Sequence, residues 1–209
     1  MSGTAGDAML VLVRHGQTEW AKNGWHTGSS DIPLTAVGED EARAVGDVLS
    51  GHRFGLALTS PLQRARRTAA LAGFPHAGVD PNLAEWDYGA YEGLTSEQIA
   101  AEHGGLWNLW RDGVPAGRTP GENAIAVRRR ADAVLVRAVE VMRRGEDALL
   151  FAHGHLLRAI GAAWLELEPE DGAAFSLATG TVSVLGFEHG RAVVKRWNCT
   201  PGILALPES

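Results

Sequence analysis

The chain has 209 residues, of which 45% are hydrophobic and 21% are charged, and its formal net charge is −6. These proportions are typical of an ordinary globular protein, and the length fits one domain over residues 1–209. The negative net charge argues against a surface that as a whole binds nucleic acid or an anionic membrane. Any site for an anion must therefore be local.

Two further features bear on where the protein works. Cys199 is the single cysteine, which excludes a disulfide within the chain and a cysteine-rich metal site. The opening residues, MSGTAGDAML, lack a basic segment, and the apolar run after them stops at Arg14. We therefore expect neither a signal peptide nor a membrane span, and a cytoplasmic location.

Strands and helices alternate in the first part of the chain. The pattern predicts strands at 9–14 and 56–60 and helices at 33–49 and 60–73. Thr35 is the expected N-cap of the first helix. For the second helix, Ser60 is the expected N-cap, Pro61 takes the first helical position, and Gly73 lies at the end.

The segment 86–120 is rich in glycine and tryptophan, and we expect an insertion with one or two short helices over one edge of the core. After it, the pattern predicts a helix at 121–144, a strand at 147–152, a helix at 156–167, and a hairpin of 181–188 and 191–197. The arginines at 128–130 are interpreted as a solvated helix face. The alternation predicts an α/β fold with three layers, in which a mostly parallel sheet carries helices on both faces.

Unusual polar residues follow three of the predicted strands. Arg14-His15 ends the first, Thr59-Ser60 the second, and His153-Gly154-His155 the strand at 147–152. In parallel sheets, ligands bind beyond the carboxyl ends of the strands. We therefore expect His15 and His153 to meet at one edge of the sheet.

Arg64 adds a cation in the first turn of the predicted helix 60–73, where the helix dipole disfavours positive charge. A phosphate would satisfy Arg14, Arg64 and the helix amides together. Each residue alone also has an ordinary interpretation, such as a hydrogen-bonded structural histidine or a solvated arginine. Together, these cationic groups would repel one another without a shared anion.

The chemistry that such a pocket can perform is restricted. The sequence contains no Walker A run, no GxSxG and no HExxH motif. A histidine in a phosphate pocket can itself act as nucleophile, and a covalent route then needs a proton donor for the leaving oxygen. The segment LAEWDYGAYEG offers three candidate acids, Glu85, Asp87 and Glu92.

The blocks LVRHGQTEW, DIPLT, SPLQRARRTA, LAEWDYGAYEG and FAHGH, in this order between about residues 10 and 160, resemble the histidine phosphatase superfamily with its phosphoglycerate mutase-like fold. The resemblance implies that His15 becomes phosphohistidine and that Glu85 protonates the leaving group and later activates water. It also implies that Arg14, Arg64 and His153 clamp the phosphoryl oxygens, and that no metal or cofactor is needed. The positions that match phosphate or substrate contacts are Thr18, Thr27, Gly28, Tyr88 and Gly154. Asp87 and Glu92 are then expected to be structural or surface carboxylates.

One position departs from the family pattern. Many relatives carry an asparagine directly after the first block, where this chain has Ala21. The small residue, together with LWNLWRDG and FAHGHLLR, resembles the branch of acid phosphatases and sedoheptulose-bisphosphatase. A phosphatase for small phosphorylated metabolites, with sugar phosphates as the expected class, is therefore the first interpretation.

Two alternatives remain. A phosphoglycerate mutase would need basic residues in the insertion, and residues 93–121 offer only Arg111 and Arg118. Arg111, between Trp107 and Trp110, would either select the substrate or face water while the tryptophans pack on the core. The second alternative is an inactive module that binds a phosphorylated ligand. Trp164, Leu165 and the terminal hairpin would form the surface of a homodimer or complete the core.

Overall fold

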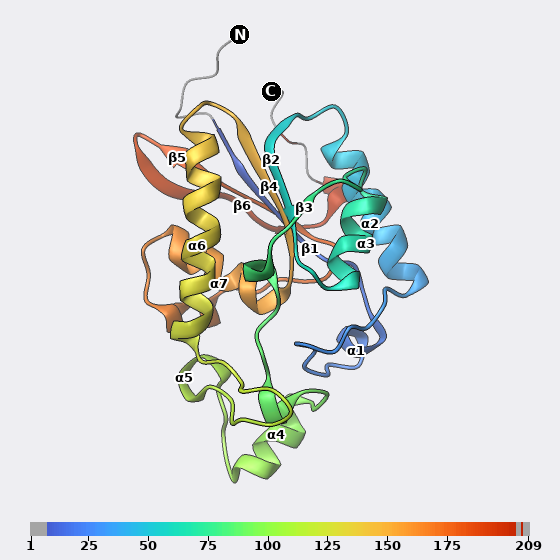
Figure 1. Ribbon diagram of the computed structural model, residues 1–209, viewed down its shortest axis with the longest axis vertical. Helices are drawn as coiled ribbons and strands as arrows, with labels where there is room; N and C mark the ends of the chain where they lie inside the picture. Colours follow the sequence, from blue (N-terminus) through green and yellow to red (C-terminus); the bar gives the residue numbers. More distant parts are fainter. Residues whose placement is uncertain (1–7, 204–205, 207–209) are drawn as a thin grey trace.

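The computed structural model describes residues 8–203 and 206, which form a six-stranded sheet between two layers of helices (Figure 1). Most of the opening segment on which the expectation of no signal peptide depends, residues 1–7, lies outside the described residues. The strands are β1 (Leu10–Arg14), β2 (Phe54–Thr59), β3 (Gly78–Val79), β4 (Asp147–Ala152), β5 (Val182–Glu188) and β6 (Arg191–Cys199). Their order is β3-β2-β4-β1-β5-β6. The first four strands in this order are parallel, while β5 is antiparallel to β1 and to β6, as expected for a mostly parallel sheet.

The two faces of the sheet are covered by different helices because successive side chains of a strand point to opposite sides. Leu10 and Leu12 of β1 pack with α6 (Ala124–Met142) and α7 (Gly154–Trp164). Val11 and Val13 pack with α2 (Ala36–Leu49) and α3 (Gln63–Leu71). Figure 1 shows these pairs of helices on either side of the sheet, which confirms the three-layer prediction.

The start of α3 differs from its prediction. The helix begins at Gln63, its N-cap position is Leu62, and it ends at Leu71, two residues before Gly73. Ser60 is not the cap, because its N–H extends the sheet by donating to the carbonyl of Phe151 at 2.9 Å. Arg64 nevertheless lies in the first turn, as predicted.

The insertion contains two short α-helices, as expected, which are α4 (Ser96–His103) and α5 (Leu109–Asp112). They lie beyond the end of the sheet at which β1, β2 and β4 finish (Figure 1). Short elements that the pattern did not predict are α1 (Glu19–Lys22), β3, and 3₁₀ helices at Pro81–Leu83, Gly89–Tyr91, Pro169–Ala174 and Pro201–Ile203. No helix in the described part of the chain is both long and apolar enough to cross a membrane.

The remaining elements follow their sequence signals closely. Thr35 caps α2 as predicted, and its side chain accepts a hydrogen bond from the N–H of Gly38.

The hairpin of β5 and β6 turns at His189 and Gly190, whose φ angles are 50° and 75°. Both angles lie in the left-handed region, which glycine adopts without strain. Trp164 is buried against Phe187 of β5 and donates to the carbonyl of Val193, so it completes the core.

Candidate active site

Adjacent parallel strands bring the two predicted histidines together. β4 lies between β1 and β2, and the N–H of His15 donates to the carbonyl of Ala152 at the end of β4. The rings of His15 and His153 have their centroids 5.1 Å apart, and both side chains are buried. The expected meeting of these residues at one sheet edge is confirmed.

The hydrogen bonds of His15 fix which nitrogen can react. The carbonyl of Gly16 lies 2.7 Å from Nδ1 and can only accept, so Nδ1 carries the proton and Nε2 keeps the lone pair. Burial lowers the pKa of His15 well below 6.5, and the charges of Arg64 and Arg14 lower it further. The ring is therefore neutral at pH 7, which is the form that a nucleophile requires.

His153 holds the neighbouring arginine. Its Nδ1 accepts from Nε of Arg64 at 3.2 Å, so its Nε2 carries the proton and donates to the Ser60 hydroxyl at 2.7 Å. Burial lowers the pKa of His153 well below 6.5, with Arg64 as the next cause. A neutral His153 is thus both an acceptor for Arg64 and a donor to Ser60.

Arg64 also shapes the loop 27–30. Its guanidinium is fully buried and donates to the carbonyls of Thr27, Gly28 and Ser30 at 2.8 to 3.0 Å. The Glu92 carboxylate accepts hydrogen bonds from the N–H groups of Gly28 and Ser30 in the same loop. The loop is therefore fixed between an arginine and a carboxylate, and Glu92 is structural, as expected.

Arg14 lies close to the start of α7. Its Nη1 donates to the carbonyl of Leu177, while its Nε is buried and has no partner among the described residues. A Cβ at Gly154 would lie 3.2 Å from Arg14 Cζ, tighter than an ordinary contact, so the glycine makes room for the guanidinium. Burial lowers the pKa of Arg14, and the nearby Glu85 opposes this effect.

Glu85 is held by backbone donors. Its carboxylate accepts the N–H of Trp86 at 2.8 Å and, from the first turn of α7, the N–H groups of His155 and Leu156 at 3.1 and 3.0 Å. These groups lie at the positive end of the helix dipole, where a carboxylate is favoured. Glu85 is thereby fixed beside the histidine and arginine that end β1.

Arg130 positions Glu85, a function that the sequence did not reveal. Its guanidinium pairs with the Glu122 carboxylate at 2.7 Å and donates to the backbone carbonyls of Asn82, Ala84 and Glu85. The interpretation of residues 128–130 as a solvated face is therefore wrong for this residue, whose side chain is 19% exposed. A run of three arginines does not indicate which of them points inward.

A pocket of about 240 Å³ opens over His15. Its lining residues are Arg14, His15, Ala21, Gly24, Trp25, His26, Thr27, Glu85, Tyr88, Ser96 and His155. Five of the predicted site residues are in this set, and the position of Ala21 is too. Arg64, His153, Thr18, Gly28 and Gly154 are not among the lining residues, and the hydroxyl of Thr18 caps α1 by accepting the N–H of Ala21.

Tyr88 and His155 form a pair within this wall. The Tyr88 hydroxyl and Nδ1 of His155 share a hydrogen bond of 2.6 Å. Burial raises the pKa of Tyr88 well above 10 and lowers that of His155 well below 6.5, so both groups are neutral at pH 7. Sequence analysis placed His155 at the end of a strand but gave it no function, because its partner is 67 residues away.

Two other predicted residues have structural environments. Asp87 accepts from the N–H groups of Gly89 and Gly121 and from the Thr119 hydroxyl, so it organises the insertion. Arg111 pairs with the adjacent Asp112 at 2.7 Å and does not line the pocket. Trp110 is buried against Trp86, and Trp107 packs on Tyr91, which agrees with the packing interpretation of the tryptophans.

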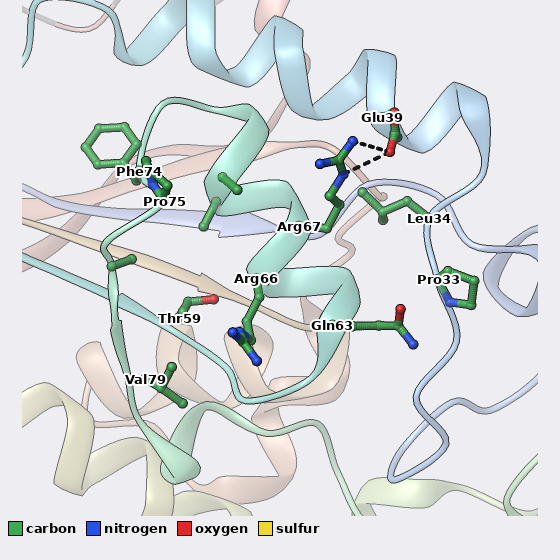
Figure 2. Close-up of a pocket in the computed structure, with 13 residues that line it drawn as sticks. Pro33, Leu34, Glu39, Thr59, Gln63, Arg66, Arg67, Phe74, Pro75 and Val79 are labelled. Atoms are coloured by element: carbon green, nitrogen blue, oxygen red, sulfur yellow. Dashed lines mark hydrogen bonds and ion pairs between the residues drawn. The ribbon is translucent and has the colours of Figure 1, made fainter.

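A larger pocket of about 580 Å³ lies along α3 on another part of the surface (Figure 2). Gln63, Arg66 and Arg67 project from α3 around it, and no histidine lines it. Its one carboxylate, Glu39, is paired with Arg67 at 2.8 Å. The smaller pocket over His15 is therefore the candidate active site. Among the described residues, no group of His, Cys, Asp or Glu side chains is arranged to hold a metal ion.

Comparisons with known proteins identify the family of the chain. The family model of the histidine phosphatase superfamily (branch 1) matches residues 10–200. An acid phosphatase of Mycobacterium tuberculosis is 39% identical over 87% of this chain and 87% of that protein. A sedoheptulose 1,7-bisphosphatase of Saccharomyces cerevisiae is 36% identical over 75% and 67%. A 2,3-bisphosphoglycerate-dependent phosphoglycerate mutase of Cytophaga hutchinsonii is 33% identical over 86% and 87%.

A solved structure shows the same fold. The structure of an open reading frame from Mycobacterium tuberculosis aligns with a TM-score of 0.87 and 36% identity, over 93% of this chain and 99% of that one. The family, the fold and the first relatives match the resemblance seen in the sequence, and together they support a phosphatase activity. The chain therefore belongs to branch 1 of the histidine phosphatase superfamily.

Proposed function

We propose that the chain is a phosphomonoesterase that hydrolyses small phosphorylated metabolites, with sugar phosphates as its class, through a phosphohistidine at His15. The observation that carries this proposal is the state of His15, a buried neutral imidazole whose Nδ1 is bound to Gly16. His15, Arg14 and Glu85 line the same pocket.

In the first step, Nε2 of His15 forms a bond to phosphorus as the bond from phosphorus to the leaving oxygen breaks. The protonated carboxyl of Glu85 gives its proton to that oxygen, and the alcohol leaves. Arg14 and Arg64 balance the charge on the phosphoryl oxygens, and His153 is the proposed third member of this clamp. Thr18, Thr27, Gly28, Tyr88 and Gly154 are the proposed further contacts of the phosphate or substrate.

In the second step, the Glu85 carboxylate takes a proton from water, and the oxygen attacks phosphorus. The bond between phosphorus and Nε2 breaks, so that inorganic phosphate leaves and His15 returns to its neutral form. No step uses a metal or another cofactor. The cycle restores both residues to their starting protonation states.

Hydrolysis is favoured over a mutase reaction by the charges of the pocket. Arg14 is the one arginine or lysine among its lining residues, whereas Arg111 is paired at the surface. A mutase must hold a second anionic group of the substrate and retain it while the phosphoryl group is returned. The filled set of catalytic positions, apart from Ala21, argues against an inactive binding module.

The test is to supply p-nitrophenyl phosphate and 3-phosphoglycerate and to measure free phosphate and 2-phosphoglycerate, with His15→Ala as control. We expect phosphate release that the variant abolishes, and an acid-labile, alkali-stable phosphoryl label on the protein during turnover. Rapid isomer formation without phosphate release would instead identify a mutase. Inertness towards a broad phosphomonoester panel would identify a binding module.

The proposed setting is the cytoplasm, with a phosphorylated metabolite as the partner. Because Trp164 of α7 is buried in the core, a homodimer would have to use other residues, for which the terminal hairpin is the proposed surface. Light scattering after gel filtration measures the mass in solution and tests the homodimer directly.

A further inference from the structure

His26 is a pocket residue whose orientation is fixed by the backbone. Its Nδ1 and its backbone N–H both lie 2.9 Å from the carbonyl of Leu94, and the N–H of Gly93 donates to the carbonyl of His26. A carbonyl can only accept, so Nδ1 carries the proton. Nε2 of the neutral ring then carries the lone pair, and it has no partner among the described residues.

Aromatic neighbours hold the ring in place. The His26 ring meets Tyr88 and Trp107 edge to face, with centroids at 4.8 and 5.5 Å, and lies nearly parallel to His155 at 6.3 Å. An imidazole that is packed in this way cannot rotate to exchange its two nitrogens without breaking the bond to Leu94. The acceptor is therefore preorganised.

The neutral form of His26 is favoured at physiological pH. Burial lowers its pKa, against smaller opposing effects of the bond to Leu94 and of the charges of Glu85 and Glu92. A neutral imidazole with Nδ1 committed accepts one hydrogen bond at Nε2 and donates none there. Nε2 of His26 can therefore accept a hydrogen bond from an O–H group, but it has no proton to donate to a carboxylate.

His26, His15 and Glu85 line the same pocket of about 240 Å³. We propose that His26 determines specificity, because its Nε2 accepts a hydrogen bond from a hydroxyl group on the alcohol part of the ester. This inference rests on the proposed phosphatase function and narrows its substrates to phosphate esters that carry a further hydroxyl group. A group without an O–H donor, such as the carboxylate of a phosphoglycerate, is selected against at the same position.

The test compares ribose 5-phosphate, which carries several hydroxyl groups, with n-propyl phosphate, which carries none. Both are measured with the wild-type protein and with the variant His26→Phe, which keeps an aromatic ring and removes the acceptor. His26→Gln restores an acceptor near the position of Nε2. His103→Phe makes the same change at an exposed histidine of α4, outside the pocket, and p-nitrophenyl phosphate reports whether the catalytic centre is intact.

We expect His26→Phe to lower the preference for ribose 5-phosphate over propyl phosphate by about tenfold in kcat/KM, mainly through KM. In His26→Phe, turnover of p-nitrophenyl phosphate should fall less than turnover of ribose 5-phosphate. His26→Gln should recover part of the preference, and His103→Phe should change nothing. An unchanged preference, or equal losses on all three esters, would overturn the inference and leave the proposed function standing. Absence of His15-dependent turnover of any ester would overturn both.

Discussion

Nε of Arg64 donates to Nδ1 of His153 at 3.2 Å, while the two terminal nitrogens of the same guanidinium reach three carbonyls of the loop 27–30. One side chain thus connects the end of β4 to the loop beside the pocket. Burial lowers the pKa of Arg64, and Glu85 and Asp31 oppose this effect. The relationship explains why an arginine is found in the first turn of a helix, where a cation is otherwise disfavoured.

Replacing Arg64 with lysine should disable the site although the charge is kept. An ammonium group is a point charge and cannot donate to His153 and three carbonyls in the fixed geometry of a guanidinium. We expect kcat/KM for p-nitrophenyl phosphate to fall by about a hundredfold or more, measured by phosphate release. The matched control is Arg66→Lys on the exposed side of the same helix, and equal activity of the two variants would contradict this account.

Activity should persist in mildly acidic solution. The pKa of His15 is lowered well below 6.5 by burial and by Arg64 and Arg14, so the nucleophile stays unprotonated as the pH falls through 6.5. A profile of kcat/KM from pH 4.5 to 9 tests this prediction. A steep loss of kcat/KM as the pH falls through 6.5 would show that His15 binds a proton there and would disprove it.

The same burial makes the fold sensitive to acid. His15, His153 and His155 each have a pKa lowered well below 6.5, chiefly by burial, so the folded protein keeps them neutral while the unfolded chain binds protons near pH 6.5. Their stabilising contribution is complete above that value and is lost as the pH falls below it. We expect Tm to drop by about 10 °C or more between pH 7 and pH 5. Calorimetry of the variant His155→Asn should show a smaller drop in Tm between these two pH values than calorimetry of the wild-type protein.

Arg130 should act on catalysis through Glu85 without touching the substrate. The variant Arg130→Met keeps the aliphatic stem and removes the donors to the carbonyls of Ala84 and Glu85. We expect about a tenfold loss in kcat with little change in KM, since the acid is misplaced while binding is kept. The exposed neighbour provides the control, Arg129→Met.

The choice of ester separates positioning from general destabilisation. p-Nitrophenol is a good leaving group and needs little help from an acid, whereas an alkyl alcohol needs a proton. Arg130→Met should therefore lose more activity on propyl phosphate than on p-nitrophenyl phosphate. Equal losses on both esters would indicate that the variant is merely unstable.

The sequence predicted those features that depend on local pattern and on the rules of parallel sheets. Apolar runs located β1, β2 and β4, and the rule for strand ends predicted that His15 and His153 meet at one edge of the sheet, where the structure has them. Thr35 could also be predicted as the N-cap of α2, because a cap residue is adjacent in sequence to the helix that it caps. The three acids Glu85, Asp87 and Glu92 were equal candidates for the proton donor until the resemblance to the family singled out Glu85.

Features that depend on distant contacts could not be predicted in this way. Ser60 has the local signature of a cap, but its hydroxyl is bound to His153, 93 residues away. Arg130 differs from its neighbours only in facing Glu122 and the segment 82–85. His26 carries no motif, and its position in the pocket depends on pairing with Leu94 in the insertion.

The pairing of β1 with β4 has a consequence for synthesis of the protein. Residues 14 and 15 emerge from the ribosome early, but the strand beside them and the first turn of α7 are made more than 130 residues later. A nascent chain that has not reached residue 153 lacks both His153 and the two α7 amides that hold Glu85. Long-range parallel pairing is slow to form, so enzymatic competence is acquired late, after most of the polypeptide has been translated.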